Sequence, residues 1–152
     1  MDKHKYEYIY FLGIGGIGMS ALARYFLHEG YGVAGYDLTA TPLTRALERE
    51  GALVHYVDDP EMIPEYMRDA EKTLVVLTPA IPADHKEWAW LREAGFTIEK
   101  RSQMLGHLSQ GKVVMAVAGT HGKTTTSTLA SWLNYAAAGE GSAFLGGISR
   151  NF

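Results

Sequence analysis

Hydrophobic residues occur along this chain in two alternating patterns. Short runs rich in aliphatic and aromatic residues are followed by longer stretches in which apolar residues recur every three or four positions. The runs predict strands at residues 6–12, 32–36, 53–57, 73–77 and 96–99. The stretches predict helices at about 19–29, 42–50, 84–94 and 102–108, with a short helical or irregular segment at 58–69. This alternation predicts an α/β fold with a doubly wound parallel sheet.

Residues that begin and end helices support these boundaries. Thr41 followed by Pro42 is typical of a helix start, because the hydroxyl can cap the helix and proline fits its first turn. Gly30, Gly51 and Gly95 directly follow predicted helices and indicate where those helices stop.

The alternation of predicted strands and helices begins again after a polar linker at residues 109–112. Residues 113–118 predict a strand, and the helix that follows carries Leu129, Trp132, Leu133 and Ala136 on one face. Residues 143–145 are a candidate for one more strand. We therefore predict a first domain at residues 1–108 and a second unit, with its linker, at residues 109–152.

A glycine-rich loop joins the first predicted strand to the first predicted helix. Residues 13–18 match the pattern G-x-G-x-x-G. Glycines allow a tight turn and let backbone N–H groups approach a diphosphate, and the start of the helix adds a positive dipole. Asp37 follows the second strand, where a carboxylate either accepts a hydrogen bond from a ribose hydroxyl or is a solvated loop residue.

A second glycine loop, residues 119–125, precedes the helix of the second unit. In a phosphate-binding loop of this kind the backbone surrounds the phosphates, Lys123 reaches the terminal ones, and the Thr124 hydroxyl can bind Mg²⁺. The loop is shorter than the common G-x-x-x-x-G-K-[ST] form, because Val117 stands where that form has its first glycine. His121 either contacts phosphate or substrate or merely fills the loop.

Composition and charge narrow the classes of function. The formal net charge of -3 provides no basic surface for nucleic acid. The absence of cysteine excludes disulfides and cysteine metal sites. No apolar run approaches the roughly 20 residues that a membrane helix needs. We therefore expect a cytoplasmic protein that binds neither nucleic acid nor a membrane.

Longer segments around both loops resemble the Mur ligase family, in its alanine-adding branch. Residues 13–20 (Gly-Ile-Gly-Gly-Ile-Gly-Met-Ser) are similar to the family's UDP-binding loop, and residues 118–126 (Ala-Gly-Thr-His-Gly-Lys-Thr-Thr-Thr) to its shortened ATP loop. The resemblance implies a Rossmann-like domain for the UDP part of UDP-N-acetylmuramate. It also implies a central domain for ATP and Mg²⁺ and a C-terminal domain that brings L-alanine.

The resemblance further implies a reaction and a set of residues. The family uses ATP to phosphorylate the muramate carboxylate, and the amine of L-alanine attacks this acyl phosphate during peptidoglycan synthesis. Lys123 is implied as the catalytic residue that stabilises charge on the transferring phosphate, and Thr124 as the Mg²⁺ ligand. The implied UDP-sugar contacts are Gly13, Gly15, Gly16, Ile17, Gly18, Met19, Ser20, Asp37, Thr78 and Ala80. The implied ATP contacts are Gly119, Thr120, His121, Gly122, Lys123, Thr124 and Thr125.

Three positions depart from the family pattern. Tyr36 stands where a small hydroxyl residue is common, Gln103 where a glutamate is common, and Asp58 about where Gly-His usually follows the third strand. These departures concern the uracil and ribose contacts more than the fold.

The second unit is short for an ATP-binding domain. Such a domain needs more strands and a carboxylate for Mg²⁺, whereas Glu140 is the only acidic residue after Thr124. We therefore expect the N-terminal part of a longer ligase, which binds the UDP-sugar without turnover. The apolar helix face is expected to pack on the first domain, to mediate self-association, or to belong to a mobile segment.

Three alternative interpretations stay open. A related ligase that adds a recycled tripeptide to UDP-N-acetylmuramate shares both loops. A nicotinamide-dependent oxidoreductase suits the first loop and Asp37 but gives the second loop no role. A non-catalytic UDP-sugar-binding module would need only the first domain.

Overall fold

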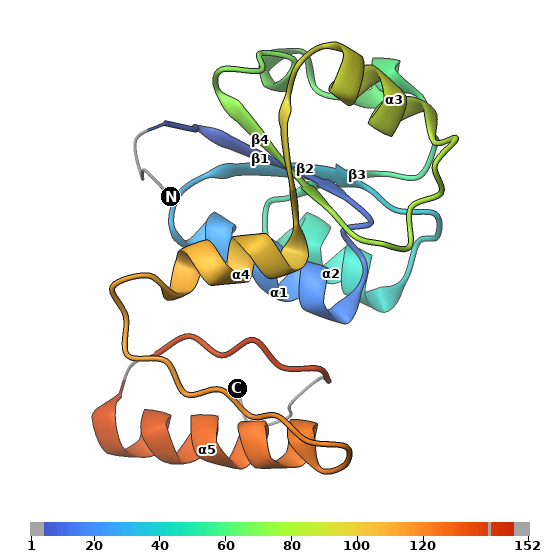
Figure 1. The fold of residues 1–152 in the computed structure, drawn as a ribbon. Helices are drawn as coiled ribbons and strands as arrows, with labels where there is room; N and C mark the ends of the chain where they lie inside the picture. The colour runs from blue at the N-terminus through green and yellow to red at the C-terminus, as the bar shows by residue number, and fades with distance from the viewer. Residues whose placement is uncertain (1–4, 140, 148–152) are drawn as a thin grey trace.

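The computed structural model, which describes residues 5–139 and 141–147, contains a five-stranded sheet (Figure 1). The strands are β1 (Tyr8–Leu12), β2 (Gly32–Tyr36), β3 (Leu53–His55), β4 (Thr73–Leu77) and β5 (Thr97–Lys100). Their order across the sheet is β3-β2-β1-β4-β5, and every neighbouring pair is parallel. The predicted doubly wound parallel sheet is therefore confirmed.

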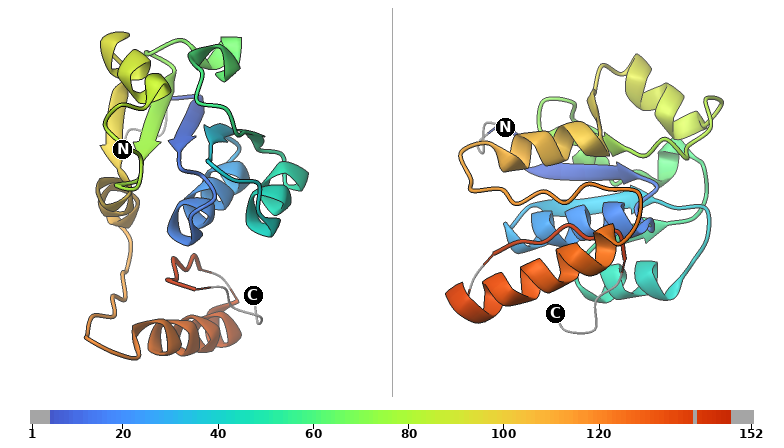
Figure 2. Two further views of the ribbon diagram at one scale, coloured as in Figure 1. Left: turned by 90° about the vertical axis from the view of Figure 1, so that its right-hand side faces the viewer. Right: turned by 60° about the horizontal axis from the view of Figure 1, so that its bottom comes forward.

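Helices cover both faces of this sheet. One face lies against α1 (Ile17–His28), α2 (Pro42–Arg49) and α4 (Arg101–Ser109), and the other against α3 (Lys86–Glu93) and two short 3₁₀ turns, η1 (Pro60–Met62) and η2 (Glu65–Met67) (Figures 1 and 2). A further helix, α5 (Lys123–Ala138), lies outside these layers, beyond α1 and α4. None of the described helices combines the length and the apolar character of a membrane span.

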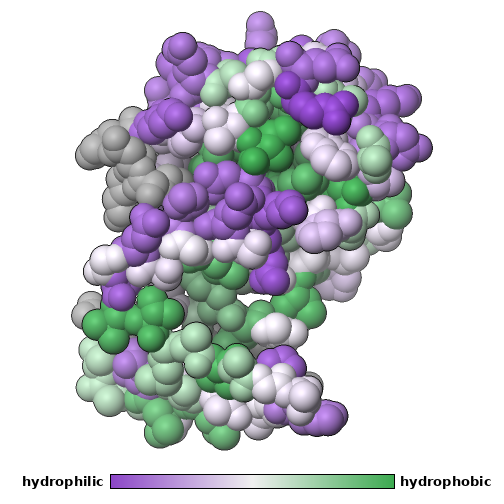
Figure 3. Space-filling model, in the orientation of Figure 1, coloured by the Kyte–Doolittle hydropathy of each residue, from purple (hydrophilic) through white to green (hydrophobic). Residues whose placement is uncertain are grey.

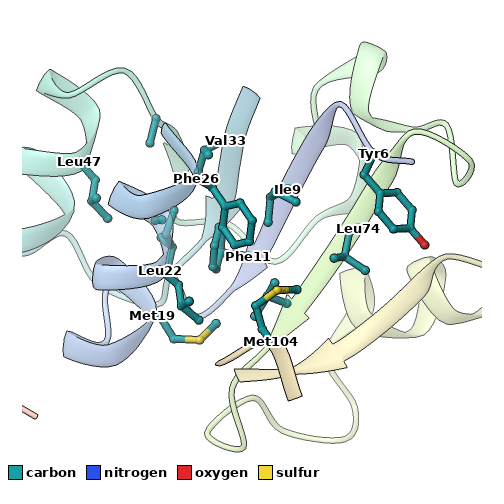
Figure 4. Packing of buried hydrophobic residues seen from close by; sticks show 14 residues of the cluster. Tyr6, Ile9, Phe11, Met19, Leu22, Phe26, Val33, Leu47, Leu74 and Met104 are labelled. Carbon is teal, nitrogen blue, oxygen red and sulfur yellow. The ribbon is translucent and has the colours of Figure 1, made fainter. Parts of the chain in front are cut away.

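Alternate residues of the central strand supply two cores. Ile9 and Phe11 of β1 pack beneath α1, where Phe11 meets Phe26 with ring centroids 6.4 Å apart (Figure 4). Tyr10 and Leu12 point to the opposite face and join the core under α3. All four strand residues are fully buried, as expected for a parallel strand that is covered on both sides.

The predicted start of α2 is confirmed in atomic detail. The Thr41 hydroxyl accepts a hydrogen bond from the Thr44 N–H at 3.2 Å, and the Thr44 hydroxyl accepts one from the Thr41 N–H at 2.9 Å. This reciprocal cap stabilises the helix by about 1 kcal/mol. The predicted helix stops at Gly30, Gly51 and Gly95 are also confirmed, because all three adopt a positive φ that favours glycine.

Two of the predicted strands are wrong. Residues 113–118 and 143–145 belong to no strand, because neither segment forms a ladder of hydrogen bonds with another described segment. Val113, Val114 and Met115 are instead exposed to solvent. A run of β-prone residues favours an extended backbone, but only a neighbouring strand turns that backbone into a sheet.

The unit that contains α5 exposes much apolar surface, as expected. Leu129, Trp132 and Leu133 are 58%, 45% and 61% exposed, and apolar residues gather over this part of the surface in Figure 3. The contact with the first domain is made by residues outside this apolar helix face. The Lys112 ammonium donates to the Tyr25 hydroxyl at 3.1 Å, and Phe144 packs against the Tyr25 ring. Self-association and the division of the chain near residue 108 stay predictions.

Candidate functional site

The order of the strands places a crevice at one end of the sheet. The chain passes from β1 to β2 on one side and from β4 to β5 on the other, so the connections after β1 and β4 diverge. Parallel sheets of this kind bind ligands at such a reversal, outside the carboxyl ends of the strands. The loop at residues 13–16 follows β1, and Thr78 follows β4, so both lie at this point.

The first glycine loop is tied to the end of β2. The N–H groups of Gly13 and Ile14 both donate to the Tyr36 carbonyl oxygen, at 2.9 and 3.0 Å. Gly13 has a φ of +87°, and a Cβ at this position would collide with the Thr78 side chain. The turn that directs the chain from β1 into α1 therefore requires glycine here.

Asp37 holds the middle of the same loop. Its carboxylate accepts a hydrogen bond from the Gly15 N–H at 2.7 Å, and a Cβ on Gly15 would lie only 2.8 Å from the same oxygen. The Asp37 N–H in turn donates to the His55 carbonyl oxygen of β3 at 3.1 Å. Asp37 is therefore a structural anchor of the loop rather than a solvated residue. Its contact with a ribose hydroxyl stays a prediction.

The start of α1 is open to an anion. Gly16 is the N-cap residue of α1 and has no side chain that could pair with the first N–H groups of the helix. The positive end of the helix dipole therefore faces outward from the loop. The start of α1 borders a cavity of about 450 Å³ that lies between the first loop and the second unit.

The cavity brings the two glycine loops together. From the first domain the walls include Gly16, Ile17, Gly18, Met19, Thr78 and Arg101. From the second unit they include Val117, Lys123, Thr124, Ser127, Phe144, Leu145 and Gly146. Two cations, Arg101 and Lys123, are on this wall, and no carboxylate from the described residues is. The cavity is therefore suited to a polyphosphate group.

Arg101 is the charged residue of the cavity wall that the sequence analysis did not predict as a contact. It is the first residue of α4, directly after β5, and so lies at the carboxyl edge of the sheet. Its guanidinium lies so close to Gly18 that a Cβ on this glycine would collide with it. A cation that directly follows a parallel strand was the available signal, but only the fold brings it to the first loop.

The second loop positions Lys123 over its own backbone. Gly122 has a φ of +73° and Gly119 a φ of +154°, so both occupy conformations that favour glycine. The Lys123 ammonium donates to the Gly119 carbonyl oxygen at 2.6 Å and to that of Thr120 at 3.3 Å. Lys123 also begins α5, whose N-cap residue again has no capping side chain. The loop therefore presents an ammonium and a helix start to the same cavity.

The predicted residues divide into those that line the cavity and those that do not. Ser20 is buried within α1, where its hydroxyl donates to the Ile17 carbonyl oxygen at 2.9 Å, and its contact with the UDP-sugar stays a prediction. Ala80 is exposed and lies off the cavity wall. Five predicted ATP contacts, Gly119, Thr120, His121, Gly122 and Thr125, are likewise exposed and off the wall. The described residues contain no cluster of metal-ligating side chains, and Glu140 lies outside them, so the Mg²⁺ role of Thr124 stays a prediction.

Comparison with known proteins assigns the family. The profile of the Mur ligase family, catalytic domain, matches residues 8–113. The chain belongs to the Mur ligase family. Among curated proteins, this Mur ligase chain is 52% identical over its whole length to a UDP-N-acetylmuramate--L-alanine ligase of Phocaeicola vulgatus, and 51% identical over 95% of its length to that of Cytophaga hutchinsonii. It spans about a third of the length of these relatives, covering 33% and 31% of them.

Solved structures show the same fold. The UDP-N-acetylmuramate-alanine ligase of Thermotoga maritima matches 93% of this Mur ligase chain with a TM-score of 0.83 and 32% identity, and the match covers 32% of that chain. The UDP-N-acetylmuramate:L-alanyl-gamma-D-glutamyl-meso-diaminopimelate ligase of Neisseria meningitidis matches 97% of it with a TM-score of 0.82 and 26% identity, covering 45% of that chain. Family membership favours a ligase over the nicotinamide-dependent oxidoreductase that the first loop alone allowed.

Proposed function

We propose that this chain provides the UDP-sugar site and the ATP loop of an ATP-dependent ligase that adds L-alanine to UDP-N-acetylmuramate. The observation that carries the proposal is the shared cavity, whose wall includes Gly16–Met19 of the first loop and Lys123 and Thr124 of the second. A ligase of this type must bring two nucleotides together, and one phosphate-binding loop on each side of a cavity does so. The curated relatives carry the same activity in their names.

On the first loop, the diphosphate of UDP-N-acetylmuramate would bind at the start of α1. Gly16 lets the sugar diphosphate approach the backbone closely, because it has no side chain to hold it away, and the missing side chain of Gly15 leaves room for Asp37 and Thr44. The Arg101 guanidinium beside Gly18 supplies a second, positively charged contact. Asp37 keeps the loop in this shape through the Gly15 N–H.

On the second loop, the glycine conformations and the uncapped start of α5 fit the phosphates of ATP. Lys123 would exchange its two carbonyl contacts for the terminal phosphate, where its charge stabilises the transferring group. The Thr124 hydroxyl would bind Mg²⁺, which offsets phosphate charge. ATP supplies the phosphoryl group that activates the muramate carboxylate for attack by the amine of L-alanine.

The identities favour L-alanine over a tripeptide as the added group. The curated alanine ligases of Phocaeicola vulgatus and Cytophaga hutchinsonii are 52% and 51% identical to this chain, whereas the tripeptide-adding ligase of Neisseria meningitidis is 26% identical. We place the activity in the cytoplasm, where ATP and UDP-sugars are available.

The proposal is tested by ADP release from a ligase of the relatives' full length that carries this chain. ADP is expected to form only when UDP-N-acetylmuramate and L-alanine are both present. L-alanyl-γ-D-glutamyl-meso-diaminopimelate in place of L-alanine should give at most a small fraction of that rate. A preference for the tripeptide would contradict the proposed specificity, and ADP release that is independent of the UDP-sugar would contradict the proposed reaction.

A further inference from the structure

Three buried polar side chains meet on the face of the sheet that α3 covers. Tyr10 lies on β1, His55 on β3 and Glu87 in the first turn of α3, and they are 0%, 9% and 0% exposed. The Tyr10 hydroxyl lies 2.6 Å from Glu87 Oε2 and 2.7 Å from His55 Nε2. We call these three residues the buried triad. It joins three elements and takes no part in the nucleotide site described above.

Hydrogen-bond chemistry fixes the number of protons in the buried triad. His55 Nδ1 lies 3.0 Å from the Val57 carbonyl oxygen, which can only accept, so Nδ1 carries a hydrogen. If Tyr10 donates to Glu87, His55 Nε2 must donate to Tyr10, which makes an imidazolium beside a carboxylate. If Tyr10 donates to His55 Nε2, Glu87 must donate to Tyr10, and both groups are neutral. Either arrangement contains one proton more than a carboxylate and a neutral imidazole.

We propose that the buried triad is a pH-sensitive contact between α3, β3 and β1. It holds one shared proton, and the loss of that proton weakens the attachment of α3 and β3 to β1. After its loss, Tyr10 has a single hydrogen for two acceptors, Glu87 Oε2 and His55 Nε2. One buried acceptor is then left without a partner, which is costly in a core. The proton can move along the triad through the Tyr10 hydroxyl, but it cannot be removed without breaking a hydrogen bond.

Negative charges near the buried triad favour retention of the proton. The Asp59 N–H donates to Glu87 Oε1 at 3.3 Å, a contact that by itself favours the carboxylate, but the charges of Asp58 and Asp59 oppose ionisation of Glu87. Asp58 accepts hydrogen bonds from the Lys86 and Glu87 N–H groups at 3.0 and 3.1 Å, so its carboxylate lies at the start of α3. Removing a proton would add a further negative charge beside these acids.

Two aromatic residues complete the surroundings of the buried triad. Tyr36 of β2 lies between the rings of His55 and His85, at centroid distances of 5.8 and 4.5 Å. His85 Nδ1 lies 3.1 Å from Asp58 Oδ1.

Burial raises the pKa of Glu87 to about 7 and lowers the pKa of His55, which favours the form in which both groups are neutral.

The direction of the pH effect follows from the carboxyl group. An unfolded chain loses the Glu87 proton near pH 4.3, whereas the folded chain keeps the shared proton to about pH 7. The stabilisation from this proton is therefore complete below about pH 4.3 and is lost as the pH rises through about 7. Glu87→Gln provides the reference, because its amide can donate to Tyr10 as a protonated carboxyl does but has no proton to lose.

The test compares denaturant unfolding of the 152-residue chain and its Glu87→Gln variant between pH 5 and 8.5. The unfolding constant of the unmodified chain, relative to the variant, is expected to rise up to tenfold per pH unit between about pH 5 and 7 and then level off. Glu93→Gln, an exposed change of the same chemistry on the same helix, should give a ratio that does not vary with pH. A flat ratio for Glu87→Gln would overturn the proposal.

Nuclear magnetic resonance of the unmodified chain gives a second test that needs no variant to fold. With labelled glutamate carboxyl carbons and histidine nitrogens, the triad at pH 6 is expected to show either a protonated Glu87 with neutral His55 or an ionised Glu87 with cationic His55. The signals of both residues should change at the same pH as it rises. An ionised Glu87 beside a neutral His55 at pH 6, or both groups protonated, would overturn the shared proton.

Discussion

The Asp37 carboxylate accepts a hydrogen bond from the Gly15 N–H at 2.7 Å, which ties the end of β2 to the middle of the first glycine loop. This contact gives the acidic residue after the second strand a structural role in addition to the ligand contact that its position predicts. The loop can therefore keep its shape before any nucleotide binds. Such preorganisation lowers the entropic cost of binding.

Replacing Asp37 separates these two roles. Asp37→Ala leaves the Gly15 N–H without its partner and should destabilise the fold by about 1–3 kcal/mol, while weakening UDP-N-acetylmuramate binding. Asp37→Asn keeps an acceptor oxygen for Gly15 and should lose much less stability. Denaturant unfolding and calorimetry measure both effects. Equal stability of the Ala variant and the unmodified chain would show that the contact does not hold the loop.

A side chain at Gly15 should abolish UDP-sugar binding. The added Cβ of Gly15→Val would lie 2.7 Å from Thr44 Cγ2 and 2.8 Å from Asp37 Oδ2, so the loop must shift away from its anchor. Gly106→Ala is the control, because a Cβ at this helical glycine meets nothing within 4 Å and replaces glycine by a better helix former. Unchanged affinity of the Val variant in a calorimetric titration would exclude this loop as the diphosphate site.

Removing the Arg101 charge should weaken the binding of the UDP-sugar without affecting the fold. Arg101 is exposed, and the loss of a charge-assisted hydrogen bond of about 1.5–3 kcal/mol corresponds to roughly a 10- to 100-fold loss of affinity for Arg101→Ala. Arg101→Lys keeps the charge and should retain part of the affinity. A weaker dependence of binding on salt in the Ala variant would confirm the lost charge. Binding equal to that of the unmodified chain would remove Arg101 from the site.

The sequence predicted most of the fold because its signals are local. The two periods of hydrophobic residues located five strands, and the Thr41–Pro42 pair located the start of α2. The errors concern contacts between distant parts of the chain. Residues 113–118 have strand-forming composition, but no described segment pairs with them.

The same limit applies to the sites. The glycine loops are local motifs, and the sequence located both of them. The position of Arg101 beside Gly18 depends on the path from β5 to α4, and the meeting of Tyr10 with Glu87 depends on how α3 packs on β1. No spacing rule within the sequence indicates either contact, because each joins residues far apart in the chain.

Lys123 is expected to serve ATP alone. In a full-length ligase that carries this chain, Lys123→Ala should abolish ADP release, because the terminal phosphate loses its cation. UDP-N-acetylmuramate binding should be retained, since the first loop and Arg101 are unchanged. Lys72→Ala, a change of the same type at an exposed lysine that is not on the cavity wall, should leave turnover intact. Substantial ADP release by the Lys123 variant would mean that ATP binds elsewhere.

Calorimetric titration of the 152-residue chain with UDP-N-acetylmuramate, and in parallel with NADH, tests the central claim most directly. The cavity beside the first glycine loop is expected to bind the UDP-sugar, with binding lost in Gly15→Val, and to show no measurable heat with NADH. NADH binding comparable to that of the UDP-sugar, or no UDP-sugar binding by the folded chain, would contradict the assignment of this loop.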